Sequence, residues 1–397
     1  MKATLLLSLL LMGLLGYWFW PEQHAPKPVL VVGALSGTLA ERDLPMMEAL
    51  RDGLRQKAEA EGISLQLHIV DSQQAAADLK TQVADILSSG VDTVMGCGDS
   101  ACVRTLLPVL QQSGALLLYP GSSEGLIDSA HLIHLGPVAN QFLFPAVSWI
   151  RDNLGQRVMF IGSESARSHM LHRLMQDQLL ADESVELIDA EFIGSQSELP
   201  QMLSKVTDYR PDVVLFDACE WYGDQPFMSG LNRQPGRVFS LCTDQLPPSD
   251  SSLFFVSAYF DNPHNPENRR LRAQYPQLSP LMVNVDWMLT MWGRALAAGH
   301  GEDMHHWLEY LRSHNDLTAA GPVLIDQHFQ GSWRGMAIQQ QVAGGGQNKL
   351  LWISDSMLRP VMYPGIEAPS DWKHFLTIFW RNAGGEWRTA VMKEERG

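Results

Sequence analysis

Short apolar runs alternate with longer amphipathic stretches along most of the chain. A short apolar run predicts a buried strand, whereas apolar positions that recur about every 3.6 residues predict one face of a helix. The predicted strands cover residues 29–35, 64–70, 93–97, 115–119, 132–135, 158–162, 185–193, 213–216, 238–241 and 254–259. The predicted helices cover residues 42–61, 78–88, 101–112, 169–180, 199–208, 282–298 and 303–312.

This alternation of strands and helices predicts parallel, doubly wound sheets. It stops between Pro137 and Pro145 and starts again at Val158, so we expect two α/β lobes. From Val323 onward the pattern is that of antiparallel strands, with a hairpin turn at 344–346. The predicted fold class is therefore α/β, with two doubly wound parallel-sheet lobes.

The N-terminus has the features of an export signal. Lys2 precedes an apolar run from Leu5 to Trp20, which Pro21 ends. This order fits a cleavable signal peptide. The aromatic residues at the end of the run fit an uncleaved inner-membrane anchor equally well, because such rings prefer the membrane interface. Both alternatives place the rest of the chain in the periplasm.

The charge of the chain excludes one class of partner. The formal net charge is −15, and an acidic chain repels polyanions. The nearest approach to a basic stripe is Arg269, Arg270 and Arg272, which we interpret as a solvated helix face. We therefore expect no nucleic acid partner.

Four cysteines occur at spacings that match no zinc ribbon and no C-x-x-C redox pair. Export would permit disulfides, and Cys97 and Cys102 are the closest pair in sequence. Because Cys97 ends an apolar run, a buried free thiol is an equally good interpretation.

Motifs for catalysis, metals and cofactors are weak. Gly121–Gly125 matches the G-x-S-x-G hydrolase elbow, but that motif needs a helix directly after the serine, and the next predicted strand leaves no room for one. His300, Asp303, His305 and His306 lie close together, but adjacent histidines on a helix point about 100° apart. No phosphate-binding glycine motif follows a strand. We expect no catalytic residue, no metal and no cofactor.

Polar loops at the carboxyl ends of the predicted strands are the best candidates for a ligand site, because ligands bind there in open parallel sheets. Gly96–Ser100 is such a loop, and Ser100 is a natural N-cap whose hydroxyl could also hold a ligand oxygen. Further polar loops lie at residues 119–122, 163–165, 217–222 and 243–244. We expect these loops to line one crevice between the lobes.

Long collinear blocks between Val29 and Pro364 carry a family resemblance. The strongest are GCGDSACVRTLLPVLQQSGALLLYPGSSEGL and HLGPVANQFLFPAVSWIRDNLGQRVMFIGS, followed by SAYFDNPHNPENRRL and AAGPVLIDQHFQGSWRGMAI. They resemble the type I periplasmic-binding family, and within it the branch that contains urea-binding proteins of ABC transporters and amide sensors of amidase operons. The resemblance implies two lobes joined by three crossovers, with the ligand in a cleft between them.

By this resemblance, Ser100, Tyr119 and Pro120 fall on ligand positions of the near lobe, and Thr243 falls in a threonine-rich loop of the far lobe. The predicted ligand-binding residues are Gly98, Asp99, Ser100, Tyr119, Pro120, Gly121, Ser165, Asp217 and Thr243. Some of these depart from the family pattern: Gly98 and Asp99 replace an aromatic residue, Gly121 replaces a threonine, and the loop around Ser165 lacks the family's tyrosine. The pocket wall is therefore expected to differ from that of a urea site.

We expect an extracytoplasmic protein that captures a small polar solute (an amide, urea or an amino acid-like compound) and delivers it to an ABC permease. The carboxylates Asp99, Asp217 and Asp244 favour a ligand with an ammonium or several N–H groups. One alternative is a ligand sensor that contacts a membrane receptor; a serine hydrolase acting through Ser123 is less favoured. The expected lobes are 28–138 with 262–325 and 139–261 with 326–371, between the N-terminal segment 1–27 and a tail at 372–397 that has no counterpart in the family.

Overall fold

The computed structural model describes residues 26–180, 185–249, 251–276, 278–298, 309, 311–342, 344, 348–365 and 367–388. Within these residues, no helix is long and apolar enough to cross a membrane. The N-terminal apolar run lies outside the described residues, and so do His300, Asp303, His305 and His306. The expectations for both segments stay predictions.

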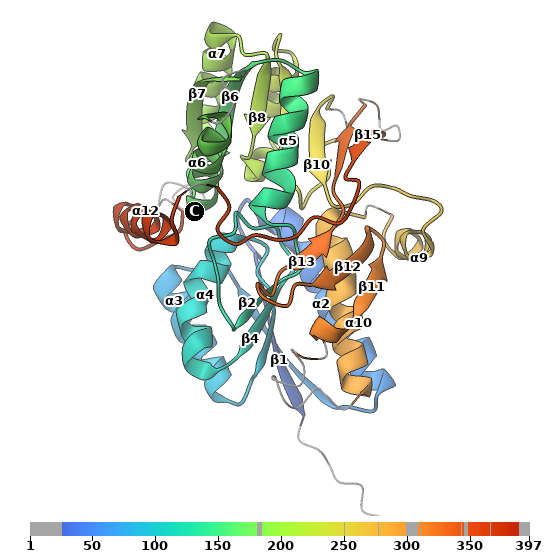
Figure 1. Cartoon of the computed structure of the whole chain (residues 1–397). Coiled ribbons are helices and arrows are strands. Elements are labelled where there is room, and N and C mark those ends of the chain that lie inside the picture. The colour runs from blue at the N-terminus through green and yellow to red at the C-terminus, as the bar shows by residue number, and fades with distance from the viewer. Residues whose placement is uncertain are drawn as a thin grey trace, which may run out of the picture.

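The first sheet is wholly parallel and forms the core of one lobe (Figure 1). Its strands lie in the order β2 (Leu65–Asp71), β1 (Lys27–Gly33), β3 (Thr93–Gly96), β4 (Leu116–Tyr119) and β5 (Leu132–His134). The connecting helices are α2 (Ala40–Ala60), α3 (Ala76–Ser88) and α4 (Ser100–Ser113). Because helices cover both faces of such a sheet, its central strands are continuous apolar runs rather than alternating ones.

The second sheet forms the core of the other lobe. Its strands lie in the order β15 (Lys349–Ile353), β14 (Ala337–Gln340), β10 (Phe254–Ser257), β9 (Arg237–Ser240), β8 (Val213–Phe216), β6 (Arg157–Ser163) and β7 (Glu186–Ile193). Strand β14 pairs antiparallel with β10 and β15, and the other pairs are parallel. The helices of this lobe include α5 (Ala139–Asn153), α6 (Ala166–Leu180), α7 (Leu199–Tyr209) and α8 (Gln225–Asn232).

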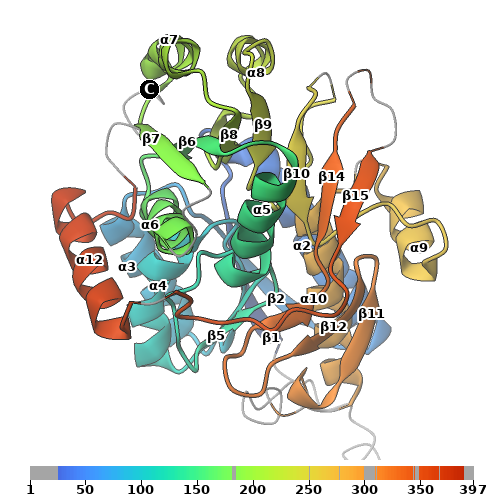
Figure 2. The ribbon, with the colours of Figure 1, turned by 45° about the horizontal axis from the view of Figure 1, so that its top comes forward.

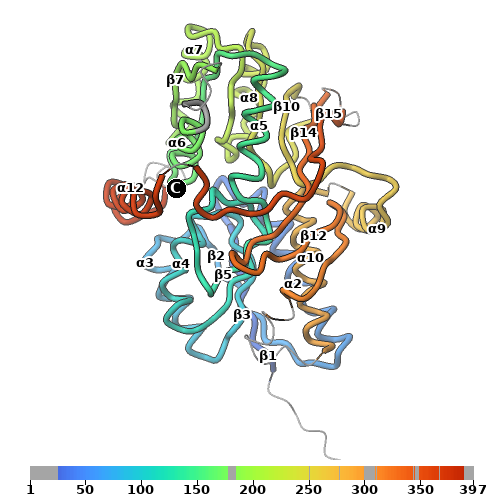
Figure 3. The backbone as a smooth tube through the Cα atoms, in the orientation of Figure 1, coloured from blue at the N-terminus to red at the C-terminus, as the bar shows by residue number. Residues whose placement is uncertain are grey.

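The chain passes between the lobes after β5, after β10 and after β13 (Figure 3). The elements between the last two passages are α9 (Pro266–Gln274), α10 (Pro280–Ala297) and a small antiparallel sheet of β11 (Asn315–Thr318), β12 (Gly321–Ile325) and β13 (Ser332–Arg334). The last helix is α12 (Pro369–Asn382). The predicted α/β fold with parallel-sheet lobes is confirmed.

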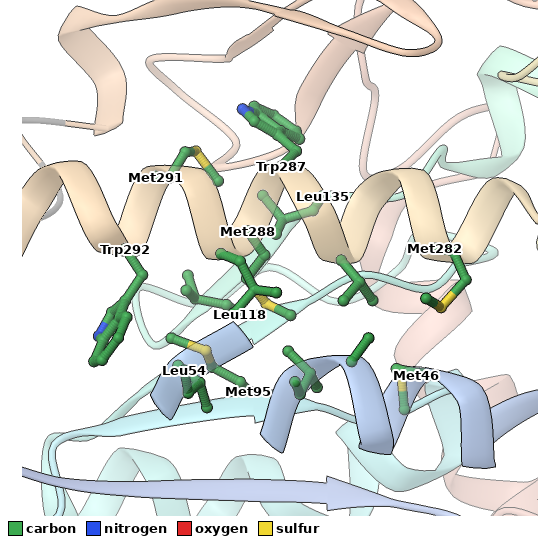
Figure 4. Close-up of a cluster of buried hydrophobic side chains, with 14 of the residues drawn as sticks. Met46, Leu54, Met95, Leu118, Leu135, Met282, Trp287, Met288, Met291 and Trp292 are labelled. Atoms are coloured by element: carbon green, nitrogen blue, oxygen red, sulfur yellow. The ribbon is translucent and has the colours of Figure 1, made fainter. Parts of the chain in front are cut away.

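Helix α10 lies across α2 and the first sheet. Met288 and Trp292 of α10 lie with Leu54 of α2 and with Met95 and Leu118 of the sheet in one buried cluster (Figure 4). This cluster joins α10 to α2 and the first sheet, so the first lobe is built from two distant parts of the chain.

Helices α5, α8 and α12 were not predicted. Helix α5 occupies the stretch that Pro137 and Pro145 had suggested was a break. A proline in a helix costs a hydrogen bond, but the buried residues Phe142, Leu143 and Ile150 give α5 an apolar face that packs into the core of the second lobe. Helix α12 begins at Pro369, at the end of the expected second lobe, and continues into the tail 372–397 that has no counterpart in the family.

Candidate functional site

The near wall of the interlobe cleft is the start of α4. Asp99 is the N-cap of this helix, because its Oδ1 accepts a hydrogen bond of 2.9 Å from the amide of Cys102. The expectation that Ser100 is the cap is therefore wrong: Ser100 is the first helical residue and its side chain is buried. First-turn amides such as those of Ser100 and Ala101 have no acceptor within their own helix, so they are free to meet a ligand.

The four cysteines form two disulfides, and both lie beside the cleft. Cys97 is bonded to Cys102, which settles the alternatives left open by the sequence. Cys219 is bonded to Cys242, a pair that sequence spacing did not suggest. The second bond forms because β8 and β9 are parallel neighbours, so that the loops at their carboxyl ends lie side by side.

The far wall is formed by the start of α6 and the ends of β6, β8 and β9. Arg167 in the first turn of α6 pairs with Asp217 at 3.2 Å, and the Ser168 hydroxyl donates to the same carboxylate at 2.7 Å. Burial raises the pKa of Asp217, although the charge of Arg167 opposes the shift. Burial also raises the pKa of Glu220, whose carboxylate accepts a hydrogen bond from Ser163.

The two lobes meet directly at Asp244. Its carboxylate accepts hydrogen bonds from the Ser122 amide at 2.8 Å and from the Ser122 hydroxyl at 2.7 Å. Arg167 reaches across from the second lobe and donates to the Ser122 hydroxyl at 3.2 Å. These contacts join the first lobe to the second, so the cleft is shut in this structure.

A small cavity of about 70 Å³ lies between the two walls. It is lined by Leu39, Arg42, Gly98, Asp99, Ser100, Ala101, Ser122, Ser163, Ser165, Ala166, Arg167, Ser168, Asp217, Cys219, Glu220, Cys242, Thr243, Asp244, Gln245, Trp387 and Arg388. Six of the nine predicted residues are among them: Gly98, Asp99, Ser100, Ser165, Asp217 and Thr243.

Tyr119, Pro120 and Gly121 do not line the cavity. The Tyr119 ring is fully buried in the first lobe, and its hydroxyl donates to the Ser122 carbonyl at 2.5 Å. The Pro120 carbonyl accepts from Asn284, and a side chain on Gly121 would collide with Tyr119. These residues shape the turn that carries Ser122, and any role of theirs in ligand contact stays a prediction.

Two buried polar atoms on the cavity wall have no hydrogen-bond partner among the described residues. One is Nη2 of Arg42, which lies 3.9 Å from Asp99 Oδ2 while the Arg42 Nε donates to Asp43 at 2.6 Å. The other is the hydroxyl of Thr243. Buried polar groups are nearly always satisfied, so unpartnered ones on a cavity wall mark places where a ligand or water binds.

Arg42, Arg167 and Arg388 line the cavity but were not predicted, whereas Glu220 lies in the loop 217–222 that was expected to line the crevice but was not among the nine named residues. The rule that selected Ser100 also applies to Arg167 and Glu220, which follow the carboxyl ends of β6 and β8. Arg42 lies in the first turn of α2, after β1, and could have been found in the same way. Nothing in the sequence pattern pointed to Arg388.

The hydrolase elbow is not formed around Ser123. Its hydroxyl accepts a hydrogen bond from the Gly125 amide at 2.9 Å, and irregular chain rather than a helix connects it to β5. In the part of the chain that the structure describes, no three acidic, histidine or cysteine side chains are grouped as metal ligands would be.

Comparison with known proteins identifies the family. A family model described as a periplasmic binding protein domain matches residues 28–226. The chain belongs to the periplasmic binding protein family. The family places the protein outside the cytoplasm and makes it a solute-binding protein, in agreement with the cleft between two lobes.

Solved structures of solute-binding proteins share the fold. A solute-binding protein of an ABC transporter from R. palustris, in complex with benzoate, aligns with a TM-score of 0.72 and 14% identity over 84% of this chain and 98% of its own. A leucine-, isoleucine-, valine-, threonine- and alanine-binding protein from Brucella ovis, in a closed conformation, aligns with a TM-score of 0.70 and 16% identity over 85% and 97%. A leucine-binding protein from Thermotoga maritima gives 0.67 and 14% over 82% and 98%.

Proposed function

We propose that the protein captures a small amino acid-like solute in this cleft and delivers it to an ABC permease. The observation that carries the proposal is the pair of unpartnered buried groups on the cavity wall, the Arg42 guanidinium nitrogen and the Thr243 hydroxyl. They come from opposite lobes, so a ligand oxygen that satisfies both holds the lobes together.

The acidic end of such a solute fits the near wall. The amides of Ser100 and Ala101 at the start of α4 favour a negatively charged oxygen, as helix N-termini do in general. The guanidinium of Arg42 adds a positive charge on the same side. A carboxylate gains more from this environment than the neutral carbonyl of an amide or of urea, because hydrogen bonds between charged groups are about twice as strong.

The amino end fits the carboxylates of the far wall. Among the described residues, neither Asp244 nor Glu220 forms an ion pair with a basic side chain. Asp244 accepts hydrogen bonds from the amide and the hydroxyl of Ser122, and Glu220 accepts one from the hydroxyl of Ser163. An ammonium group is a donor that complements two such acceptors. The benzoate-binding and leucine-binding proteins named above take ligands with a carboxylate, which supports the acidic half of this assignment.

A thermal-shift screen tests the ligand class. We expect one or more of the twenty standard amino acids to raise the melting temperature, because a ligand that binds only the folded state adds about 2.7 kcal/mol of stability at a concentration of one hundred times its Kd. Acetamide, urea and benzoate are the comparison compounds. A shift with acetamide or urea alone would overturn the amino acid assignment and favour the amide branch. Delivery to a permease, as opposed to sensing, is tested by whether permease genes adjoin the gene.

Substitution of Thr243 by valine separates binding from folding. The side chain keeps its shape and loses an unsatisfied buried hydroxyl, so we expect the free energy of unfolding to rise by about 1 kcal/mol. Affinity for the amino acid from the screen should fall roughly tenfold, since the ligand loses a partner. Thr105→Val is the matched control, because the Thr105 hydroxyl already bonds to the Ala101 carbonyl within α4. Unchanged affinity in Thr243→Val would remove Thr243 from the site.

The variants Ser100→Ala and Tyr119→Phe distinguish a residue that contacts the ligand from one that supports the structure of the cleft wall. Because Asp99 is the cap, Ser100→Ala should change stability by less than about 0.5 kcal/mol and weaken binding roughly tenfold. Tyr119→Phe breaks the bond to the Ser122 carbonyl and should cost about 1 kcal/mol of stability. Calorimetric titration and urea unfolding of both variants provide the measurements. A Ser100→Ala protein that binds as tightly as its parent would show that the Ser100 hydroxyl does not contact the ligand.

A further inference from the structure

The C-terminal helix α12 is fixed to the second lobe. Trp372 is fully buried in the core of that lobe, beside α6. The Arg173 guanidinium of α6 lies over the rings of Trp372 and Phe375 and pairs with Glu367 at 2.6 Å, just before the helix. Figure 2 shows α12 alongside α6 and close to α3 of the first lobe. The end of α12 therefore lies where the two lobes meet.

After α12 the chain turns and enters the cleft. Gly384 and Gly385 have φ values of +65° and +87°, a conformation that glycine adopts without strain and that ends the helix. The next residue, Glu386, contacts the first lobe, where its carboxylate accepts from the Ala76 amide at 3.2 Å. Ala76 is the first residue of α3.

Trp387 contacts both lobes. Its carbonyl accepts from the Ala166 amide at 3.1 Å, which uses one of the free donors at the start of α6 in the second lobe. Its ring lies 5.4 Å from the guanidinium carbon of Arg104, which belongs to α4 of the first lobe.

Arg388 completes the bridge and faces the ligand cavity. Its backbone forms a short antiparallel bridge with Ser165 of the second lobe. Its guanidinium reaches the first lobe, where it pairs with Asp99 and donates to Gln73 at 3.2 Å. Arg388 also lines the cavity, so one residue contacts both lobes and the ligand space.

We propose that residues 384–388 form a strap across the ligand cleft that holds the lobes closed and slows release of the ligand, with Arg388 as its principal contact. The physical reason is thermodynamic linkage between tail binding and lobe closure. Helix α12 stays on the second lobe when the cleft opens. The contacts of the tail with Ala76, Arg104 and Asp99 form only while the first lobe lies against the tail, so opening the cleft breaks these contacts. A segment that binds only the closed form shifts the equilibrium toward that form. The cavity lies beside the strap and is not filled by it, so the strap is not a plug in the ligand site. The predicted effect on ligand release rests on the proposed ligand class, whereas the predicted effect on lobe closure does not.

Pulsed electron paramagnetic resonance on the full chain tests closure without any ligand. Spin labels at Asp85→Cys in α3 and Ser204→Cys in α7, both exposed, report the distance between the lobes. The native cysteines are all in disulfides and do not react with the label. We expect Arg388→Ala to lower the ratio of closed to open molecules about tenfold, as expected for loss of a charged hydrogen bond. Arg388→Lys should restore part of it.

Arg381→Ala is the matched control, because Arg381 is exposed on α12 and its loss should leave the distances unchanged. The standard amino acid that binds tightest in the screen provides the second readout: its dissociation should be about tenfold faster from Arg388→Ala. Unchanged lobe distances in Arg388→Ala would overturn the strap. Tighter binding by Arg388→Ala would overturn it too, and would make the tail a plug. If no amino acid binds, the proposed ligand fails while the distance measurement still decides the strap.

Discussion

Replacement of Arg104 by methionine is expected to destabilise the protein by about 3–5 kcal/mol, because it leaves a buried carboxylate without its cation. Glu124 is completely buried, and its Oε1 accepts from Arg104 Nε at 3.0 Å and Nη2 at 2.6 Å. Burial alone would raise the pKa of Glu124, but the charges of Arg104 and Arg167 outweigh burial and lower it. Urea unfolding at neutral pH measures the loss.

The sign of the pH dependence follows from this lowered pKa. The pair stabilises the native state above the pKa of an unfolded glutamate, and its contribution disappears as the pH falls through the lower pKa of the folded state. The double variant Arg104→Met with Glu124→Gln removes both charges and should regain most of the stability. Arg151→Ala, which breaks an exposed pair with Asp152, should cost less than about 1 kcal/mol. An Arg104→Met protein as stable as its parent would mean that the Glu124 carboxyl takes up a proton at little cost.

Loss of the Cys219–Cys242 disulfide is expected to have the second large effect. The bond closes a loop with a sequence separation of 23, for which loop entropy predicts about 3 kcal/mol of stability. It also joins the loop that carries Asp217 and Glu220 to the loop that carries Thr243 and Asp244. The variant with both cysteines replaced by alanine should therefore melt lower and bind its ligand more weakly even where it is fully folded.

The Cys97–Cys102 disulfide serves as the comparison. Its sequence separation is only 5, so the same entropy argument gives about 2 kcal/mol. Calorimetric melting of the two double-alanine variants tests which disulfide contributes more to stability. Ligand titration well below their melting temperatures tests which disulfide affects binding. If the Cys219–Cys242 variant bound ligand with the affinity of the parent, the loops would keep their geometry without the bond, and its role would be confined to stability.

Much of the fold follows from local patterns. The buried runs at β1, β3, β4 and β8 have lengths and flanking residues that predict strands, and the order of strands and helices predicts parallel sheets. That prediction in turn directs attention to the carboxyl ends of the strands. Asp99, Ser100 and Thr243 were found in this way without any knowledge of how the lobes are oriented, because the pleat and the right-handed crossover place these loops on one edge of each sheet.

Only the tertiary structure shows which distant residues lie beside these loops in the cleft. Pairing of Ser122 with Asp244 requires two lobes in contact, and residues so far apart in sequence leave no periodic signal. Tyr119 has the sequence environment of a ligand contact, yet its hydroxyl is used by a carbonyl only three residues away, which depends on the exact path of the turn. The entry of Arg388 into the cleft depends on the docking of α12 against α6, through side chains such as Trp372 whose partners come from another part of the chain. Local pattern determines which segments are strands and helices, whereas contacts between distant segments, and therefore the ligand site, are determined by packing.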